Sequence, residues 1–198
     1  MASKSDRTRQ FIIEQAAPLF NTKGYAATSM SDIMEVTGLA KGGLYGNFES
    51  KDQLAKEALI FSFNELNSAL RAKTRQETTY KGKLLAILDF YKNYTTHPVI
   101  EGGCPLLNAA IDADDQLPFL REVAHHFLKD SLSAITAIIA KGKVNGEFKP
   151  DLNAADEAEW IFATLEGGIM MSKLAGTSKI LNRLLDRIIS EVNIKYSR

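Results

Sequence analysis

Small hydroxylated and basic residues gather between positions 28 and 51, and their chemistry suits a negatively charged partner. Hydroxyls and free backbone N–H groups at a helix N-terminus bind phosphate oxygens. Lys41 precedes two glycines, which let a partner approach the backbone closely because they carry no side chains. The pattern predicts contacts with the phosphates and base edges of a nucleic acid. The candidate residues are Thr28, Ser29, Ser31, Lys41, Gly42, Gly43, Tyr45, Gly46, Asn47 and Lys51.

Several of these residues also have structural roles open to them. Ser29 is a candidate helix cap as well as a phosphate ligand, and one hydroxyl can serve both purposes. Tyr45 either joins the core or directs its phenol to a phosphate, and we favour the phosphate. Asn47 either contacts adenine or phosphate or lies on the surface. Leu44 and Phe48 have the spacing of buried residues.

Two short helices joined by a glycine turn must position these side chains. Ser29, followed by Asp32 three places later, predicts a capping box at the start of the first helix. Gly38 ends that helix, since glycine adopts the left-handed conformation without steric penalty. A second helix then begins at Lys41 and extends toward Phe48. This order, with a basic N-terminus on the second helix, is typical of proteins that read the DNA major groove.

The rest of the chain is predicted to form further helices and no strand. Apolar residues recur three or four positions apart in the long segments, and none alternates as a strand does. Pro18 lies inside the first helix, where we expect a bend or an end to regular hydrogen bonding near Glu14. The prediction is an all-α fold of about nine helices. Outside the helix-turn-helix, these cover residues 6–23, 51–72, 80–96, 105–111, 118–144, 153–175 and 178–195.

Composition is that of an ordinary globular protein, with 45% apolar and 24% charged residues. No apolar run approaches the ~18 residues that a membrane-spanning helix needs. The first residues lack the apolar segment of a signal peptide. Cys104 is the single cysteine, which excludes an internal disulfide. These features predict a cytoplasmic protein without a membrane partner.

The net charge is zero, and its distribution along the chain is only slightly asymmetric. Residues 1–83 carry 12 Lys/Arg against 9 Asp/Glu, or +3, and the remainder carries 12 against 15, or −3. Affinity for DNA must therefore come from a few Lys or Arg side chains and helix N-termini at specific positions, rather than from a broadly basic surface. Dimerisation would double the number of these contacts.

These motifs resemble those of the TetR family of bacterial transcription regulators. The likeness is strongest over residues 6–55. Beyond residue 55 it is one of architecture, together with the Gly-Cys-Pro-Leu-Leu-Asn segment at 103–108. The motifs within 6–55 are Phe20–Tyr25, Thr28-Ser29, Asp32-Ile33, Thr37–Leu39, Lys41–Phe48 and Ser50-Lys51.

The resemblance implies a helix-turn-helix DNA-binding domain over residues 1–50. It also implies an effector-binding and dimerisation domain over residues 51–198, with a homodimer formed through the last two helices, 153–175 and 178–195. Two departures bear on DNA reading. Ala40 stands where the family usually has Ser or Thr, so the recognition helix loses a cap worth ~1 kcal/mol. Gly46 replaces what is often a bulky polar residue, so we expect substantial dependence on backbone contacts, DNA shape and dimer spacing.

An apolar effector pocket is expected between helices of the second domain. For each aromatic or sulfur-containing candidate taken singly, we favour a place in the ordinary core. Asn108, Asp112 and Glu166 are polar candidates for orienting a ligand, with surface or capping roles equally open. The ligand itself cannot be named from the sequence. The candidate pocket residues are Phe63, Phe90, Tyr91, Tyr94, Cys104, Asn108, Trp160, Phe162, Glu166, Met170 and Met171.

Cys104 follows two glycines at an expected helix N-terminus, a setting that favours the thiolate and hence oxidation or alkylation. One interpretation is a redox sensor with Lys173 nearby, and the other is an inert small residue. Adjacent His125 and His126 point about 100° apart on a helix, so they do not form a metal site by themselves. We expect no metal and no cofactor.

The sequence thus predicts a ligand-responsive transcriptional regulator. We expect a homodimeric repressor that a small molecule or a thiol-reactive effector releases from double-stranded operator DNA. The alternatives are a helical interaction protein that does not bind DNA and a helical enzyme. No His stands in a recognisable Cys-His or Ser-His motif, no phosphate-binding loop follows a strand, and no paired metal-ligand signature is present. We therefore do not expect an enzyme.

Overall fold

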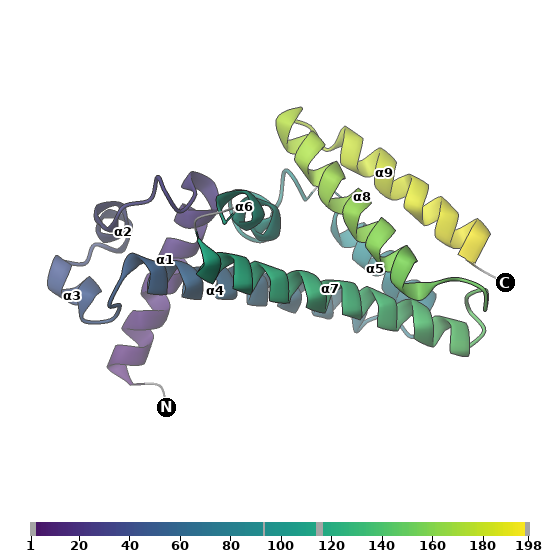
Figure 1. Ribbon diagram of the computed structural model, residues 1–198, viewed down its shortest axis with the longest axis horizontal. Coiled ribbons are helices and arrows are strands. Elements are labelled where there is room, and N and C mark those ends of the chain that lie inside the picture. The colour runs from purple at the N-terminus through teal and green to yellow at the C-terminus, as the bar shows by residue number, and fades with distance from the viewer. Residues whose placement is uncertain (1–2, 93, 114–116, 197–198) are drawn as a thin grey trace. The chain divides into compact units, whose positions relative to one another are not determined.

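The computed structural model describes residues 3–92, 94–113 and 117–196, which form an all-α fold (Figure 1). Within these ranges the chain has nine α-helices, one π-helical turn and no strand, which confirms the predicted fold class. None of the described helices combines the length and the apolar character needed to cross a membrane. The elements are α1 (Lys4–Lys23), α2 (Met30–Thr37), α3 (Lys41–Tyr45), α4 (Lys51–Thr74), α5 (Tyr80–Phe90), α6 (Pro105–Asp112), α7 (Pro118–Val144), α8 (Ala154–Leu174), α9 (Lys179–Glu191) and η1 (Val192–Tyr196).

Packing divides the chain into two compact units. Unit 1 comprises Met1–Leu66 and Ile100–His126, and unit 2 comprises Asn67–Val99 and Phe127–Arg198. Unit 1 therefore contains α1, α2, α3 and α6, and unit 2 contains α5, α8 and α9, while α4 and α7 supply residues to both. The predicted domain division between residues 50 and 51 stays a prediction.

Unit 1 is built on an apolar core that its first helices share. Ile12 of α1, Ile33 of α2, Leu44 of α3 and Leu54 of α4 are completely buried in one cluster. Each such side chain contributes about 1.5–3 kcal/mol through removal from water. Packing rather than propensity must hold α3, because isolated helices much longer than its five residues are already marginal in water.

The first helix is longer than predicted and is not interrupted by its proline. Ser3 and Asp6 form a capping box that begins α1 at Lys4. The helix continues through Pro18 to Lys23. Pro18 has no N–H to donate to the Glu14 carbonyl oxygen four residues earlier, and the expected bend stays a prediction. The apolar side of α1 is buried through Ile12, Ile13, Ala16 and Ala17. This burial outweighs the one backbone hydrogen bond that Pro18 removes.

The helix predicted over residues 80–96 ends early. In the structure α5 stops at Phe90, and Tyr91 and Tyr94 lie in the turns that follow, although Asn93 is outside the described residues. Both tyrosines are almost fully buried, and their ring centroids lie 5.1 Å apart. The burial of Tyr91 and Tyr94 agrees with their apolar spacing, but the helix predicted from that spacing does not extend to them. Tight turns can also direct successive aromatic rings inward.

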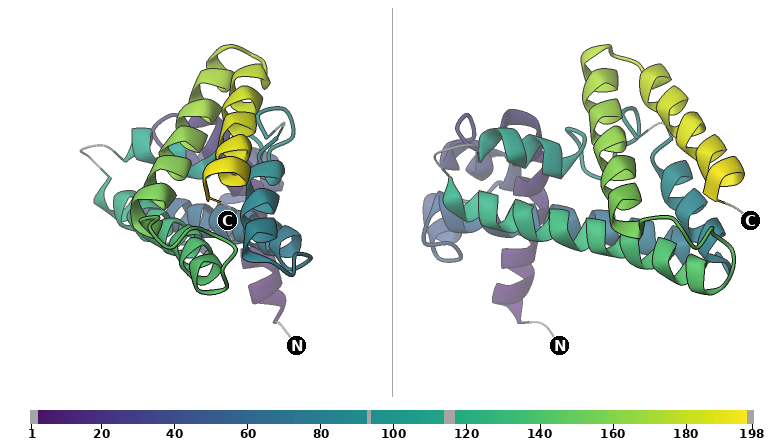
Figure 2. Two further views of the ribbon diagram at one scale, coloured as in Figure 1. Left: turned by 90° about the vertical axis from the view of Figure 1, so that its right-hand side faces the viewer. Right: turned by 45° about the vertical axis from the view of Figure 1, so that its right-hand side comes forward.

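In unit 2, α8 and α9 lie side by side (Figure 2). Leu181, Leu185 and Ile188 form the buried stripe of α9 that the sequence predicted. Gly168 of α8 permits the close approach, since a Cβ there would lie 3.0 Å from a methyl carbon of Leu181. The last predicted helix is not uniform, because α9 ends at Glu191 and the chain widens into the π-helical turn η1.

Candidate nucleic-acid interface and effector cavity

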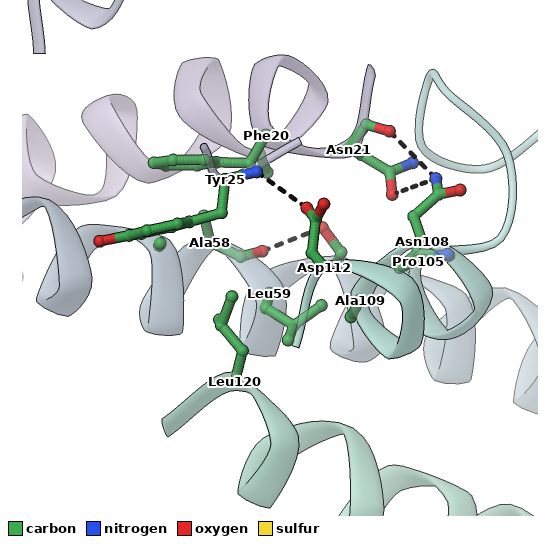
Figure 3. A pocket seen from close by; sticks show the side chains of 13 residues that line it. Phe20, Asn21, Tyr25, Ala58, Leu59, Pro105, Asn108, Ala109, Asp112 and Leu120 are labelled. Atoms are coloured by element: carbon green, nitrogen blue, oxygen red, sulfur yellow. Dashed lines mark hydrogen bonds between the residues drawn. The ribbon is translucent and has the colours of Figure 1, made fainter. Parts of the chain in front are cut away.

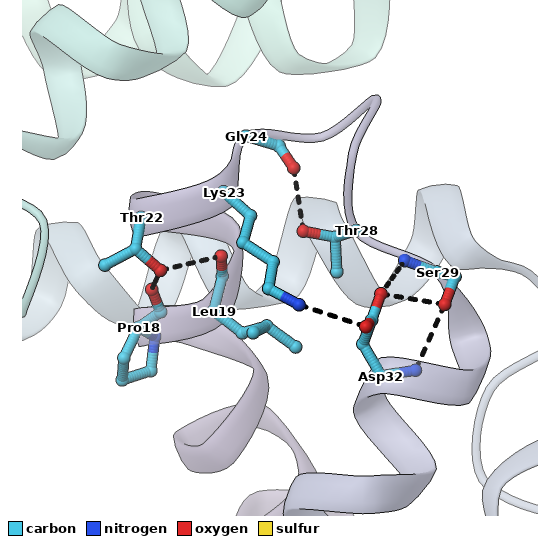
Figure 4. Close-up of polar contacts among 8 residues, drawn as sticks. All are labelled: Pro18, Leu19, Thr22, Lys23, Gly24, Thr28, Ser29 and Asp32. Atoms are coloured by element: carbon cyan, nitrogen blue, oxygen red, sulfur yellow. Dashed lines mark hydrogen bonds and ion pairs between the residues drawn. The ribbon is translucent and has the colours of Figure 1, made fainter.

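The N-terminus of α2 has the predicted capping box. The Ser29 hydroxyl accepts a hydrogen bond from the Asp32 N–H at 3.1 Å, and the Asp32 carboxylate accepts one from the Ser29 N–H at 2.7 Å (Figure 4). Lys23 reaches the same carboxylate from α1, with 3.0 Å between its Nζ and Oδ1. The hydrogen bonds from Ser29, and then the Lys23 ammonium, lower the pKa of Asp32 to about 2. Capping by Ser29 is confirmed, and its phosphate contact stays a prediction.

Thr28 does not lie where the sequence suggested. Its side chain is completely buried, and its hydroxyl donates a 2.7 Å hydrogen bond to the carbonyl oxygen of Gly24 (Figure 4). The prediction that Thr28 contacts DNA is therefore wrong, because this hydroxyl closes the loop between α1 and α2. Ser31, the second residue of α2, is exposed and stays a candidate for a phosphate contact.

The second helix of the motif presents a bare surface. Ala40 makes no side-chain cap, as predicted, while Lys41, Gly42 and Gly43 are exposed. A Cβ placed on Gly42 would have no atom within 4 Å, so this face is open to a partner. The side chain of Tyr45 is directed outward, with 45% of the residue exposed. The predicted burial of Leu44 and Phe48 is confirmed, and these two side chains hold α3 on the core.

Other predicted DNA ligands already have partners within unit 1. The Asn47 amide donates one N–H to the Gly43 carbonyl oxygen at 2.7 Å, and its second N–H and its Oδ1 can still meet a base or a phosphate. The Lys51 ammonium lies 4.2 Å from the centroid of the Tyr25 ring. Tyr25 in turn donates to Asp52, and burial together with this bond raises the pKa of the Tyr25 phenol to about 12. Gly46 is exposed at the end of α3.

Unit 2 contains a cavity of about 460 Å³. Apolar side chains from four helices form much of its wall. Polar side chains of α4 and α7 complete it. The lining residues are Asn67, Leu70, Arg71, Thr74, Ile87, Tyr91, Asp130, Ser131, Ser133, Ala134, Ile135, Ile138, Phe162 and Leu165.

Only part of the predicted pocket coincides with this cavity. Tyr91 and Phe162 line it, whereas Phe90, Tyr94 and Glu166 are not among its lining residues. Three further candidates on α8 do not line this cavity and are partly exposed, so their place in a pocket stays a prediction. They are Trp160, Met170 and Met171, at 38%, 43% and 40% exposed.

The remaining predicted pocket residues belong to unit 1. Phe63 and Cys104 are buried and do not line the cavity of unit 2, so a pocket role for either stays a prediction. Asn108 lines a separate cavity of about 40 Å³ among α1, α4, α6 and α7 (Figure 3). Its amide donates to the main-chain and side-chain oxygens of Asn21, both at 3.0 Å. Asp112 accepts from the backbone N–H of Tyr25 at 2.8 Å.

Cys104 is the N-cap residue of α6, as predicted, but makes no side-chain cap and is only 2% exposed. Lys173, its predicted neighbour, is an exposed residue of α8 and belongs to the other unit. Among the described residues, no three His, Cys, Asp or Glu side chains gather as a metal site would require. The thiol sensor stays a prediction.

Sequence reasoning missed the polar part of the unit 2 cavity. Asn67, Arg71 and Thr74 are four and three residues apart on α4, so they share one side of the helix. That shared side of the helix is a usable signal, but the predicted pocket included none of these three residues. Nothing in the sequence indicated which segment of α7 would face them.

Comparison with known proteins agrees with this architecture. Residues 12–58 match the family described as bacterial regulatory proteins, tetR family, and residues 81–188 match the tetracyclin repressor-like C-terminal domain. A TetR transcriptional regulator from Chloroflexus aurantiacus is 34% identical, with a TM-score of 0.94 over 98% of each chain. A TetR family regulator from Cytophaga hutchinsonii is 36% identical, with a TM-score of 0.91 over 100% of this chain and 98% of that one.

The transcriptional repressor DhaR of Mycobacterium sp. (strain GP1) is 21% identical over 180 residues, which cover 89% of this chain and 88% of DhaR. The class of protein follows from three findings, which are the all-α fold, the helix-turn-helix at α2 and α3, and the two family matches. Together they define a bacterial helix-turn-helix regulator. The chain belongs to the TetR family and is a transcriptional regulator.

Proposed function

We propose that this regulator is a cytoplasmic homodimeric repressor without catalytic activity, which binds double-stranded operator DNA through α2 and α3. The observation that carries the proposal is the exposed N-terminal side of α3, where Gly42 and Gly43 leave the backbone open beside Lys41. Ser29 and Ser31 add hydroxyls at the N-terminus of α2, and Tyr45 adds an exposed phenol. Two copies of α3 would enter successive major grooves about 34–36 Å apart. The name of the relative DhaR, a repressor, supports repression.

Substituting Gly42 tests this mode of binding. We expect Gly42→Leu to fold, because a Cβ at this exposed position meets no atom within 4 Å, and to obstruct the face that approaches DNA. We expect affinity for the DNA flanking its own gene to fall at least about tenfold, and wild-type binding to weaken steeply as salt rises. Ala137→Leu, on an exposed position of α7, is the control of equal size. Retention of full affinity by Gly42→Leu, or failure of the wild-type protein to shift any genomic fragment, contradicts the proposal.

We propose that the dimer forms through α8 and α9. Trp160, Met170, Met171 and Leu174 leave large apolar surfaces exposed on α8, and a Cβ at Gly167 would meet no atom within 4 Å. Exposed apolar patches of this kind mark interaction surfaces. Sizing at micromolar concentration should therefore give a dimer for the wild-type protein and a monomer for Leu174→Glu. Val144→Glu, equally exposed at the end of α7, should remain dimeric.

The effector site that we propose is the cavity of unit 2. Its volume of about 460 Å³ falls in the range of small-molecule sites. Its wall suits an amphipathic molecule, with an apolar body against Ile135 and Phe162 and a polar end near Arg71 and Asp130. Ile135→Trp places an indole in the cavity and reduces its volume, and we expect DNA release by the effector to be impaired while DNA binding itself is kept. An unchanged response would place the effector elsewhere.

A thiol-reactive effector acting at Cys104 is the alternative input that we propose. Its support is the position of Cys104 at the N-terminus of α6, and its burial requires an opening of the structure before a reagent can reach it. Hypochlorous acid or an electrophile should release the wild-type protein from DNA but not Cys104→Ser. Unchanged DNA binding while Cys104 is modified excludes the sensor.

A further inference from the structure

Arg9 of α1 makes three contacts that connect it with both α3 and α4. Its Nη1 donates to the backbone carbonyl oxygen of Asn47, the second residue after α3. Its Nη2 donates to a carboxylate oxygen of Glu57 on α4, and these two groups form an ion pair. The guanidinium carbon lies 4.1 Å from the centroid of the Phe48 ring. One side chain thus bridges three helices of unit 1.

The recognition helix has few restraints of its own. It has five residues, two of them glycine, and Ala40 provides no side-chain cap. Glycine in a helix costs up to about 1 kcal/mol against alanine. The carbonyl oxygens of Gly42, Gly43 and Leu44 accept hydrogen bonds from residues 46–48, directly after α3, so these bonds do not tie the helix to α1 or α4. Leu44 and Phe48 set how deeply α3 sits on the core. Apolar contacts are not directional, so they do not by themselves fix its orientation.

The guanidinium of Arg9 supplies directional restraint at the C-terminal end of α3. A planar guanidinium donates in fixed directions, so the bonds to Asn47 and Glu57 together define where that end lies relative to α1 and α4. The positive charge of Arg9 is also attracted to the partial negative charge at the C-terminus of the helix.

The same contacts neutralise the charge of Arg9 within the protein. Glu57 offsets it at hydrogen-bond distance, and the Arg9 and Glu57 side chains are only 32% and 30% exposed. Lys41, by contrast, is exposed and forms no ion pair with the described residues. Arg9 is therefore poorly suited to bind a DNA phosphate.

We propose that Arg9 is a positioning residue for DNA recognition. It acts through the Asn47 carbonyl and Glu57 to hold α3 in the orientation that enters the groove, and it makes no phosphate contact of its own. The inference rests on the proposed binding of DNA through α2 and α3.

The binding experiment uses the full-length protein and a duplex from the DNA flanking its own gene that the wild-type protein retards. Arg9→Gln should weaken binding about tenfold, while the slope of log affinity against log salt stays at the wild-type value. Arg7→Gln removes the same charge from an exposed position of α1 and should change the affinity by less than about twofold. Each phosphate contact that is lost makes the slope shallower by about 0.9. A shallower slope for Arg9→Gln, or an unchanged affinity, overturns the proposal.

A second measurement is independent of DNA. In protein labelled with ¹⁵N-glycine, Arg9→Gln should shift or broaden the amide signals of Gly42, Gly43 and Gly46, with Gly38 and Gly102 as internal references. Unchanged α3 signals overturn the positioning role. If the wild-type protein binds no DNA, the proposed function fails while this measurement still decides what Arg9 does to α3.

Arg9→Lys covers the case in which Arg9→Gln does not fold. Lysine keeps the charge but cannot donate to Asn47 and Glu57 in the fixed directions of a guanidinium. We expect it to lose affinity as Arg9→Gln does, with the wild-type salt slope. Wild-type affinity in Arg9→Lys would show that charge alone is needed, and the proposal would be wrong.

Discussion

Each unit of this protein encloses a cavity, and the two cavities differ in volume and in how their polar groups are satisfied. The cavity of unit 1 measures about 40 Å³, and Asn21, Asn108 and Asp112 around it form hydrogen bonds with one another or with backbone groups. The cavity of unit 2 measures about 460 Å³, and the side chains of Arg71 and Asp130 in its wall form no hydrogen bond or ion pair with the described residues.

This difference suggests different roles for the two cavities, packing for the one in unit 1 and ligand binding for the one in unit 2. The smaller cavity has room for little more than a water molecule, and its satisfied polar groups specify how α6 meets the end of α1. The larger one has the volume and the mixed wall of a ligand site, with polar groups available to a ligand. Substitutions of the same kind should therefore have unequal effects in the two units.

Adding the same side-chain volume to each cavity should give the largest contrast. Ala58 lies in the tight wall of the unit 1 cavity and is 1% exposed, whereas Ala134 lines the cavity of unit 2. Ala58→Leu should lower the free energy of unfolding by about 2–3 kcal/mol, because the packed surroundings must shift. Ala134→Leu should change it by less than about 0.5 kcal/mol. Urea denaturation followed by circular dichroism measures both, and equal losses would remove the distinction.

Removing one carboxylate from each cavity should give the next contrast. Asp112→Ala leaves the Tyr25 N–H without its acceptor and should cost about 1.5 kcal/mol. Asp130→Ala removes no hydrogen bond to a described residue and should be neutral within about 0.5 kcal/mol. Asp112→Asn retains an acceptor oxygen and should recover part of the loss. A destabilisation by Asp130→Ala as large as that by Asp112→Ala would contradict this reading of unit 2.

The smallest effect concerns pH, through Tyr25 in the wall of the unit 1 cavity. Burial and then the bond to Asp52 raise its pKa to about 12 in the folded protein, against about 10 when unfolded. The folded state therefore favours the neutral phenol, and its stabilising contribution is complete below pH 10 and is lost as the pH rises toward 12. The difference in stability between the wild-type protein and Tyr25→Phe should decrease over that interval. A difference that stays constant from pH 9 to 12 would show that the hydroxyl is not held as described.

The comparison also explains which parts of the molecule could be predicted. The helix-turn-helix was predicted nearly residue by residue, because its determinants act within four positions of one another. Ser29 bonds to Asp32 three residues away, and Gly38 takes its left-handed conformation, φ 66°, alone. Burial of Leu44 and Phe48 also followed from local spacing.

Predictions of sites failed where a contact between distant segments decides the outcome. Thr28 is a plausible phosphate ligand by residue type, but the packing of unit 1 buries its side chain completely. Trp160 and Met170 have the same apolar character as Phe162, and only the packing of α8 determines that they lie outside while Phe162 lines the cavity. Hydropathy states that a side chain prefers burial but does not state where.

The sequence by itself determined the all-α class, most helix boundaries and the DNA-reading motif, because helix caps, glycine turns and apolar periodicity depend on neighbours along the chain. Only the tertiary structure decided which residues line the cavity of unit 2, the burial of Thr28 and the bridge from Arg9 to Asn47 and Glu57, which are 38 and 48 residues away. These features depend on which helices meet and in which register, and that is set by the packing of the whole core at once.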